Sequence, residues 1–179
     1  MTVLSIVEVP DPRLRLVCEP VAAVDDEVRT LIADMFETMY AARGIGLAAS
    51  QVGVIRRVMV VDLQERETEE EDAKPEARRD PHAFVNPEIV WASDELSTYN
   101  EGCLSIPEQY AEVERPARCR VKWLDENGQP HEEEFHGLMA TCVQHEIDHL
   151  NGVLFIDHIS RLKRQMLLKK LDKARKAAA

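Results

Sequence analysis

The sequence predicts an α+β domain of antiparallel strands and three helices, and three observations support this class. Apolar side chains recur at helical spacing in three segments, 25–43, 138–150 and 160–179. Strand-like apolar runs occupy three others, 57–62, 84–91 and 118–123. Asn127-Gly128 is a strong two-residue hairpin signal, so the strands on either side of it are expected to pair antiparallel. The 179 residues suit one domain, 1–179, with a buried core.

Composition excludes several classes of protein. The formal net charge of −11 argues against nucleic-acid binding by the whole surface and against DNA as a partner. No apolar run approaches the ~20 residues of a membrane span, so no membrane contact is expected. Residues 1–8 have neither the basic region nor the small-residue cleavage site of a signal peptide, so we expect a cytoplasmic protein.

The N-terminal part is expected to be a lead-in followed by a helix. Pro10-Asp11-Pro12-Arg13 is a proline-punctuated turn, and Pro20 closes a short extended segment. Asp25-Asp26 then cap a helix that ends at Arg43-Gly44. Five apolar positions of this helix follow the helical period and are expected to lie in the core: Val28, Leu31, Ile32, Met35 and Met39.

Residues 44–51, Gly-Ile-Gly-Leu-Ala-Ala-Ser-Gln, are expected to form a tight loop packed in the core. Two glycines with small neighbours let the backbone pass close to a ligand, a metal or another strand. The segment lacks the third glycine of a dinucleotide fingerprint and the lysine of a phosphate loop. Gln51 is its one long polar side chain, with both a donor and an acceptor.

The middle of the chain has strands interrupted by a charged segment. The β-branched run 57–62 predicts a buried strand. Residues 65–81 are dense in charge and poor in apolar side chains, which indicates a charged surface insertion. In the following strand, 84–91, Pro87 indicates an edge position or a bulge.

The hairpin around Asn127-Gly128 has a charged outer face. Bases alternate with apolar residues in 118–123, which predicts a half-buried strand. Glutamates 132–134 lie on the return strand, and the outward ones are expected to pair with those bases.

The segment Gln144-His145-Glu146-Ile147-Asp148-His149-Leu150 is the clearest chemical signal. Two histidines four residues apart lie on one face of a helix, where both imidazoles can bind one metal ion. Glu146 projects beside that metal and can hold or deprotonate a bound water. By helical phase, Asp148 faces away from the metal. It is expected to hold a ligand in place or to pack against neighbouring residues. Asn151-Gly152 ends the helix. The alternative to a metal site is a helix that carries two histidines with no shared role.

The C-terminal part is basic. The apolar run 153–156 predicts a short strand before a helix that begins near Ser160. One side of this helix is expected to be apolar: Leu162, Met166, Leu168 and Leu171. Residues 160–179 hold eight Lys or Arg against one acid, Asp172, a net of +7. Such a run is usually a solvated face, and contact with RNA or the ribosome is the alternative.

Two histidines do not complete a hydrolytic metal site, because such sites use three protein ligands and keep one position for water. The chain after His149 has neither the downstream glutamate of a gluzincin nor the third histidine of a metzincin. The four cysteines, at positions 18, 103, 119 and 142, show no Cys-x-x-Cys spacing and are expected to be reduced. Cys103 is favoured as third ligand because its thiolate is soft and Gly102 permits close approach. Cys142, one turn before His145, is the other candidate for the third ligand.

Three motifs, in order and spacing, resemble the signature motifs of the peptide deformylases. They are Gly44-Ile45-Gly46-Leu47-Ala48-Ala49-Ser50-Gln51, Glu101-Gly102-Cys103-Leu104-Ser105 and Gln144-His145-Glu146-Ile147-Asp148-His149. The similarity also takes in Pro10 to Arg15, so it covers nearly the whole chain, although the 65–81 insertion is longer than expected for the family. The resemblance implies an α+β fold of antiparallel strands packed around a central helix carrying His-Glu-x-x-His, with a C-terminal helix.

The resemblance also implies a reaction and a metal. Peptide deformylases remove the N-formyl group from the initiator methionine of newly made polypeptides and release formate. Carried over to this chain, Cys103, His145 and His149 are the metal ligands, and Glu146 is the general acid/base. The family typically uses Fe(II), and Zn(II), Ni(II) or Co(II) can take its place.

The remaining roles implied by the resemblance concern the substrate. Gln51 and the backbone N–H of Leu104 are expected to donate to the formyl oxygen. Ile45, Gly46 and Gly102 are expected to line the substrate path. The expected partners are N-formylmethionyl nascent peptides, with a ribosome contact through the basic C-terminal helix, and the protein is expected to be a monomer.

Two other functions fit parts of the pattern. A His-Glu-x-x-His endopeptidase is disfavoured by the missing downstream ligand and by Cys103. A non-catalytic metal-binding protein would close the metal's shell with Cys103, Cys142, His145 and His149, and would leave no position for water.

Overall fold

The computed structural model describes residues 1–64 and 78–179. Most of the predicted insertion, 65–81, therefore lies outside the described residues. The elements in chain order are η1 (Pro12–Arg15), α1 (Asp26–Ala41), β1 (Gly46–Ala48), η2 (Ala49–Val52), β2 (Val58–Val61), β3 (His82–Ala92), β4 (Leu96–Cys103), β5 (Ile106–Pro116), β6 (Arg118–Leu124), β7 (Pro130–His136), α2 (Gly137–Leu150), η4 (Phe155–His158) and α3 (Arg161–Ala178). This is the predicted α+β class with its C-terminal helix.

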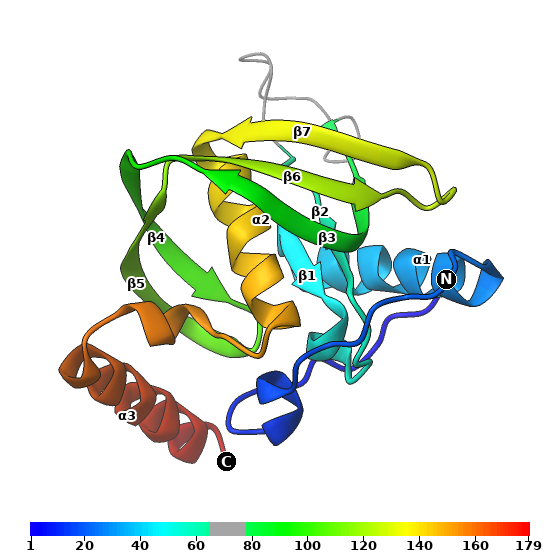
Figure 1. Cartoon of the computed structure of the whole chain (residues 1–179). Helices are drawn as coiled ribbons and strands as arrows, with labels where there is room; N and C mark the ends of the chain where they lie inside the picture. The colour runs from blue at the N-terminus through cyan, green and yellow to red at the C-terminus, as the bar shows by residue number, and fades with distance from the viewer. Residues whose placement is uncertain (65–77) are drawn as a thin grey trace.

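The strands form two antiparallel sheets (Figure 1). One has five strands in the order β1-β2-β3-β6-β7, and the other is the β4–β5 hairpin. The predicted hairpin is confirmed, since β6 and β7 pair antiparallel around Asn127-Gly128, where Gly128 has φ +75°. Its connection is longer than the two residues expected, because Leu124 and Pro130 are the last paired residues of the two strands. The predicted charge pairing is confirmed too: Arg120 Nε lies 2.8 Å from Glu132 Oε2, and Arg118 Nη1 lies 3.3 Å from Glu134 Oε1.

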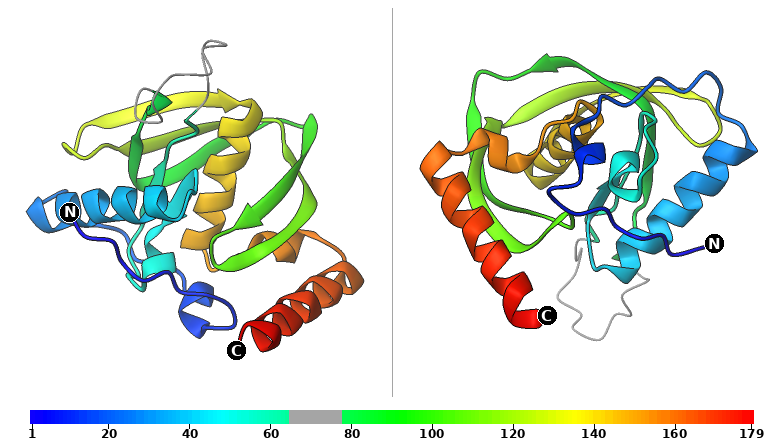
Figure 2. Two further views of the ribbon diagram at one scale, coloured as in Figure 1. Left: turned by 180° about the vertical axis from the view of Figure 1, so that it is seen from behind. Right: turned by 90° about the horizontal axis from the view of Figure 1, so that it is seen from below.

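Helix α2 lies between the two sheets, and the view along it in Figure 2 shows strands on several sides. Ten of its fourteen residues are buried. Its apolar side chains Ala140, Val143 and Ile147 share one core cluster with Phe84 and Val121 of the five-stranded sheet. A helix buried on so many sides cannot have a wide polar face. The polar side chains of α2, such as His145, Glu146 and His149, are therefore buried in the interior.

Helix α1 packs on the other part of the core. Its predicted cap is confirmed, because the Asp25 carboxylate accepts a 3.0 Å hydrogen bond from the Val28 N–H. Val28, Ile32, Met35 and Met39 are buried as expected, while Leu31 is only partly buried. This helix covers β1 and β2 with a second apolar cluster. It thereby fixes the position of residues 46–52, which form strand β1 and the turn η2, where a loop was expected over 44–51.

One expectation for a single element needs correction, and one open alternative is decided. Residues 153–156 are not a strand: they lead into η4, because the Asp157 carboxylate accepts a hydrogen bond from the Leu154 N–H and closes a helical turn. Pro87 does not mark an edge, since β3 pairs with both β2 and β6. The alternative, a bulge, is confirmed by the register shift between Val85 and Glu88.

The apolar side of α3 also differs from the prediction. Leu167 and Leu171 are buried against β5, and Leu168 packs beside them. Leu162 and Met166 are 68% and 55% exposed. The N-terminal cap near Ser160 is confirmed by its hydrogen bond from the Lys163 N–H. Within the described residues, no helix has the length and apolar character needed to cross a membrane.

Candidate metal centre

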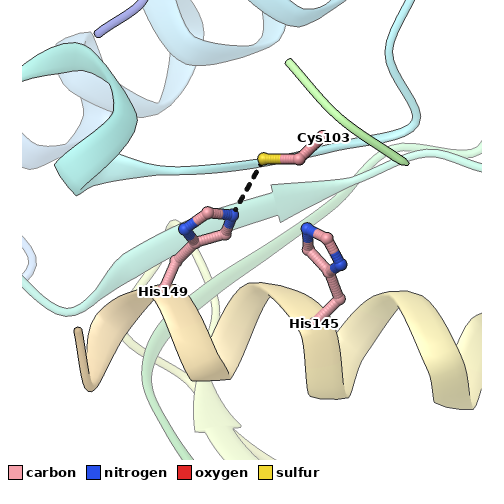
Figure 3. Close-up of side chains that lie close together, drawn as sticks. All are labelled: Cys103, His145 and His149. Carbon is pink, nitrogen blue, oxygen red and sulfur yellow. Dashed lines mark hydrogen bonds between the residues drawn. The ribbon is translucent and has the colours of Figure 1, made fainter. Parts of the chain in front are cut away.

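Three side chains with metal-ligand atoms meet where β4 ends against α2. The ligand atoms of Cys103, His145 and His149 all lie within 4.8 Å of one another (Figure 3). Cys103 Sγ is 3.3 Å from His149 Nε2. Cys103 is the last residue of β4, at an irregularity in the pairing with β5 that begins after Gly102. The two histidines project from one face of α2, as their spacing predicts.

This group suits a catalytic transition-metal ion. One thiolate and two imidazoles are a three-ligand set that leaves a further position for water or substrate. Among the described residues, it is the one group of three or more His, Cys, Asp or Glu side chains arranged to bind a metal. Cys142, the predicted rival, is buried in the apolar cluster of the five-stranded sheet and is not part of the group.

Glu146 lies inside this site rather than on the surface of α2. Its side chain is buried, and its Oε1 is 4.0 Å from His145 Nε2. Its other oxygen has no hydrogen-bond partner among the described residues. Burial raises the pKa of Glu146 to about 7. A carboxylate with a pKa near neutrality can both accept and return a proton at physiological pH.

Gly46 is adjacent to Glu146. A Cβ at this position would lie 2.8 Å from Glu146 Oε1 and 3.1 Å from its Cγ, so a side chain there would collide with the carboxylate. Gly46 begins β1, which forms one edge of the five-stranded sheet. Ile45 precedes it, and its carbonyl accepts a hydrogen bond from the Asp62 N–H. The structure therefore places Gly46 beside the candidate acid/base, with Ile45 directly before it in the chain.

Gln51 is held in the site by three interactions. Its amide nitrogen donates to Cys103 Sγ at 3.4 Å and to Ser105 Oγ at 3.1 Å, and its oxygen accepts from the Ala48 N–H at 2.9 Å. The side chain is 1% exposed, so its orientation is fixed by these contacts. Its donor group thus points to the ligand sulfur.

Leu104 and Gly102 flank Cys103 in the chain. A Cβ on Gly44 would lie 2.8 Å from Leu104 Cδ1, so the first and second motifs pack directly against each other. A Cβ on Gly102 would lie 2.5 Å from the ring of Tyr110, its partner on β5. A side chain at position 102, directly before the ligand cysteine, would therefore have to displace the Tyr110 ring.

Glu101 and Arg115 support the site, although neither was predicted to have a role in it. Glu101 Oε1 lies 2.8 Å from His145 Nδ1, and Arg115 pairs with both Glu101 and Asp148. This contact holds the His145 proton on Nδ1 and leaves Nε2 for a metal. Glu101 could have been noticed as an acid two residues before Cys103. Arg115 shares the inward face of β5 with Val113, but an isolated arginine in a strand gives no clear signal.

The electrostatics of the two histidines differ. Burial would lower the pKa of His145, but hydrogen bonds with Cys103 and Glu101 raise it to about 10. Burial and the charge of His145 lower the pKa of His149 well below its usual value. Burial opposes ionisation of Glu101, yet hydrogen bonds from His145 and Arg115 hold its pKa below the usual value. A metal at His145 must therefore displace a proton, so metal binding should release protons.

We expect iodoacetamide to modify Cys103 before the other thiols in chelator-treated protein. Cys103 is partly exposed, whereas Cys18, Cys119 and Cys142 are buried. Burial raises the pKa of Cys119 to about 11, so only about one thiolate in a thousand would be present at pH 8. Peptide mass spectrometry would identify the modified residue, and Zn(II) should protect it. Metal-dependent protection of Cys142 instead would contradict the arrangement described above.

The chain resembles known proteins over its whole length. A family model described as polypeptide deformylase matches residues 3–165. The peptide deformylase of Rhizorhabdus wittichii is 64% identical over 177 residues, covering 99% of this chain and 98% of that protein. The peptide deformylase of Novosphingobium aromaticivorans is 58% identical over 99% of this chain and all of that protein. The solved peptide deformylase of Ehrlichia chaffeensis has a TM-score of 0.89 at 44% identity, covering 99% of both chains.

Proposed function

The chain belongs to the peptide deformylase family of metal-dependent hydrolases, and from this premise we propose which residues carry out its reaction. The reaction is the removal of the N-formyl group from newly made polypeptides. We assign Cys103, His145 and His149 as the metal ligands and Glu146 as the general acid/base. The observation that carries this assignment is the clustering of the three ligand atoms within 4.8 Å, with Glu146 buried beside them.

Glu146 moves the protons in the proposed mechanism. Cys103, His145 and His149 would hold a metal ion, which would act as a Lewis acid and lower the pKa of a water molecule. Glu146 accepts a proton from the attacking water and later delivers it to the amine nitrogen as the bond to the formyl carbon breaks. The products are formate and a free amino terminus.

Gln51 and Leu104 stabilise the charge that develops on the formyl oxygen. The Gln51 amide and the Leu104 backbone N–H are the proposed donors, and preorganised donors of this kind contribute a few kcal/mol each. The substrate is proposed to pass Ile45, Gly46 and Gly102. The close packing of Gly46 against Glu146 supports this path, since it places the backbone of β1 beside the carboxylate.

Fe(II) is the metal we propose for the native protein, with Zn(II), Ni(II) or Co(II) able to substitute. A soft thiolate with two imidazoles suits each of these ions. Metal analysis of protein purified without oxygen would test the assignment. Iron at one equivalent would support it, and zinc alone at one equivalent would contradict it.

The function is tested by loading the protein anaerobically with Fe(II), and separately with zinc or nickel, and measuring formate release from formyl-Met-Ala-Ser. Cleavage of casein would be measured in parallel with the same samples. Formate release without casein cleavage is the expected result. Casein cleavage without formate would indicate an endopeptidase. Bound metal without either activity would indicate a closed, non-catalytic site.

We expect Gln51→Glu to lower kcat by about 10²–10³-fold, the usual cost of losing one such donor. The substitution keeps an oxygen that can accept from the Ala48 N–H and replaces the NH₂ donor with a second carboxylate oxygen. Steady-state kinetics with formyl-Met-Ala-Ser would measure it. Gln129→Glu, at the exposed β6–β7 turn, is the matched control and should behave as wild type. An unchanged kcat in Gln51→Glu would remove Gln51 from the mechanism.

The cellular setting is proposed from the substrate. Nascent chains are made in the cytoplasm, so the protein is proposed to act there as a single-domain monomer. Helix α3 is proposed to contact the ribosome, because eight of residues 160–179 are Lys or Arg in an otherwise acidic protein. Salt-sensitive co-sedimentation with ribosomes, lost on deletion of residues 161–179, would support this contact. Co-sedimentation unaffected by the deletion would exclude α3 as the contact.

A further inference from the structure

The proposed metal ligands come from two elements that are far apart in the chain. Cys103 ends β4, while His145 and His149 lie on α2. The distance between the sulfur and the imidazoles therefore depends on how β4 is held against α2. Apolar packing alone sets such a distance loosely, whereas a metal site requires it within about 0.5 Å.

Arg115, near the end of β5, connects these two elements. Its Nε donates to Glu101 Oε2 at 2.7 Å, and its Nη2 donates to Glu101 Oε1 at 3.0 Å. Its Nη1 donates to Asp148 Oδ2 at 2.8 Å. Glu101 lies on β4 and is the partner of His145, and Asp148 precedes His149 on α2. One guanidinium thus reaches the immediate neighbours of both imidazoles.

The burial of Arg115 is unusual. Its side chain is 4% exposed, and among the described residues it is the one arginine or lysine in the buried class. A buried ion pair is weak evidence for a gain in stability, because desolvation offsets the attraction. The ion pairs of Arg118 and Arg120 lie on the exposed side of the β6–β7 hairpin. The guanidinium fork of Arg115 is therefore better explained by the geometry that it imposes.

Asp148 is restrained from a second side. His158, on η4, has its Nε2 2.7 Å from Asp148 Oδ2, the same oxygen that accepts from Arg115. The His158 side chain is 34% exposed, so a connected chain of polar groups runs from His145 to the surface. It passes through Glu101, Arg115 and Asp148.

We propose that Arg115 is a positioning residue for the metal centre. By holding Glu101 and Asp148 together, it sets the separation of Cys103 from the two histidines and fixes the ring of His145. His158 completes the restraint on Asp148. This inference rests on the proposed function, since it takes Cys103, His145 and His149 as the ligands. A lysine at position 115 would keep the charge but could not make the forked contact with Glu101.

The test uses Arg115→Met in the full-length protein loaded with Co(II). We expect Co(II) to dissociate to a chelator about 10–100-fold faster than from wild type, the usual effect of losing an outer partner of a metal ligand. The visible Co(II) absorption should shift, and kcat should fall while KM stays within about 3-fold. Arg120→Met removes an exposed arginine that also pairs with a glutamate, and should leave all three readouts unchanged.

Asp148→Asn provides a second variant that keeps the size of the side chain. It should change Co(II) dissociation in the same direction by a smaller factor, and it decides the question if Arg115→Met does not fold. Arg115→Lys should not restore the wild-type spectrum. Wild-type dissociation and spectra in the folded variants would overturn the inference and leave the ligand assignment standing. If Cys103→Ala bound Co(II) as wild type does, the ligand assignment itself would fall, and this inference with it.

Discussion

Replacing Glu146 with alanine is expected to lower kcat for formyl-Met-Ala-Ser by about 10²–10⁴-fold, the range for loss of a general acid/base. Metal content should be unchanged, because the proposed ligands are Cys103, His145 and His149. The Glu146 carboxylate lies within the site but contacts the His145 ring nitrogen only at 4.0 Å. The measurement is a steady-state assay of formate release, with metal stoichiometry determined on the same sample.

The control for this variant is Glu133→Ala, which removes an exposed carboxylate from β7. It should retain wild-type kcat and metal content. Because Gly46 packs against the Glu146 side chain, the alanine variant also needs a melting curve to show that β1 remains in place. A metal-loaded, folded Glu146→Ala protein with substantial activity would refute the assigned role.

Replacing Cys103 with alanine is expected to weaken metal binding by more than about 100-fold, since loss of a ligand should exceed the 10–100-fold cost of losing its supporting partners. Two histidines on one helix are left, and they do not form a complete hydrolytic set. The affinity would be measured by competition with a chelator, using Zn(II) or Co(II). Activity should fall with metal occupancy.

Cys142→Ala separates the two candidate thiols. Cys142 is buried with Ala140 and Val143 in the core cluster, so its replacement should lower stability through a small cavity and leave metal affinity unchanged. The opposite pattern, with metal lost from Cys142→Ala and kept in Cys103→Ala, would assign the third ligand to the helix.

Local patterns in the sequence predicted most of the fold. Helix α2, helix α1 with its Asp25 cap and the β6–β7 hairpin each depend on neighbouring residues, and periodicity or turn chemistry reveals them. The apolar run 153–156 was misassigned because burial alone does not distinguish a strand from a turn. In α3, the prediction placed Leu162, Met166, Leu168 and Leu171 on the buried side. Leu171 is buried and Leu168 partly buried as predicted, but tertiary packing buries Leu167 and leaves Leu162 and Met166 exposed.

The site residues also fall into two groups: those that local motifs predict and those whose role depends on contacts between distant segments. The motifs identified residues that the structure brings together: Gln51, Cys103, His145, Glu146 and His149. The supporting residues Glu101 and Arg115 could not be assigned from local spacing. Their roles depend on contacts between β4, β5 and α2, which are set by the topology rather than by any one segment.

The position of α2 inside the molecule has a consequence for how the protein loses its activity on heating. With ten of its fourteen residues buried, this helix has few backbone amides that local fraying can expose. Its amide protons should exchange with solvent at the rate of global unfolding. The midpoint for loss of activity should then coincide with the midpoint of the melting transition, because His145, Glu146 and His149 belong to the part of the fold that opens last.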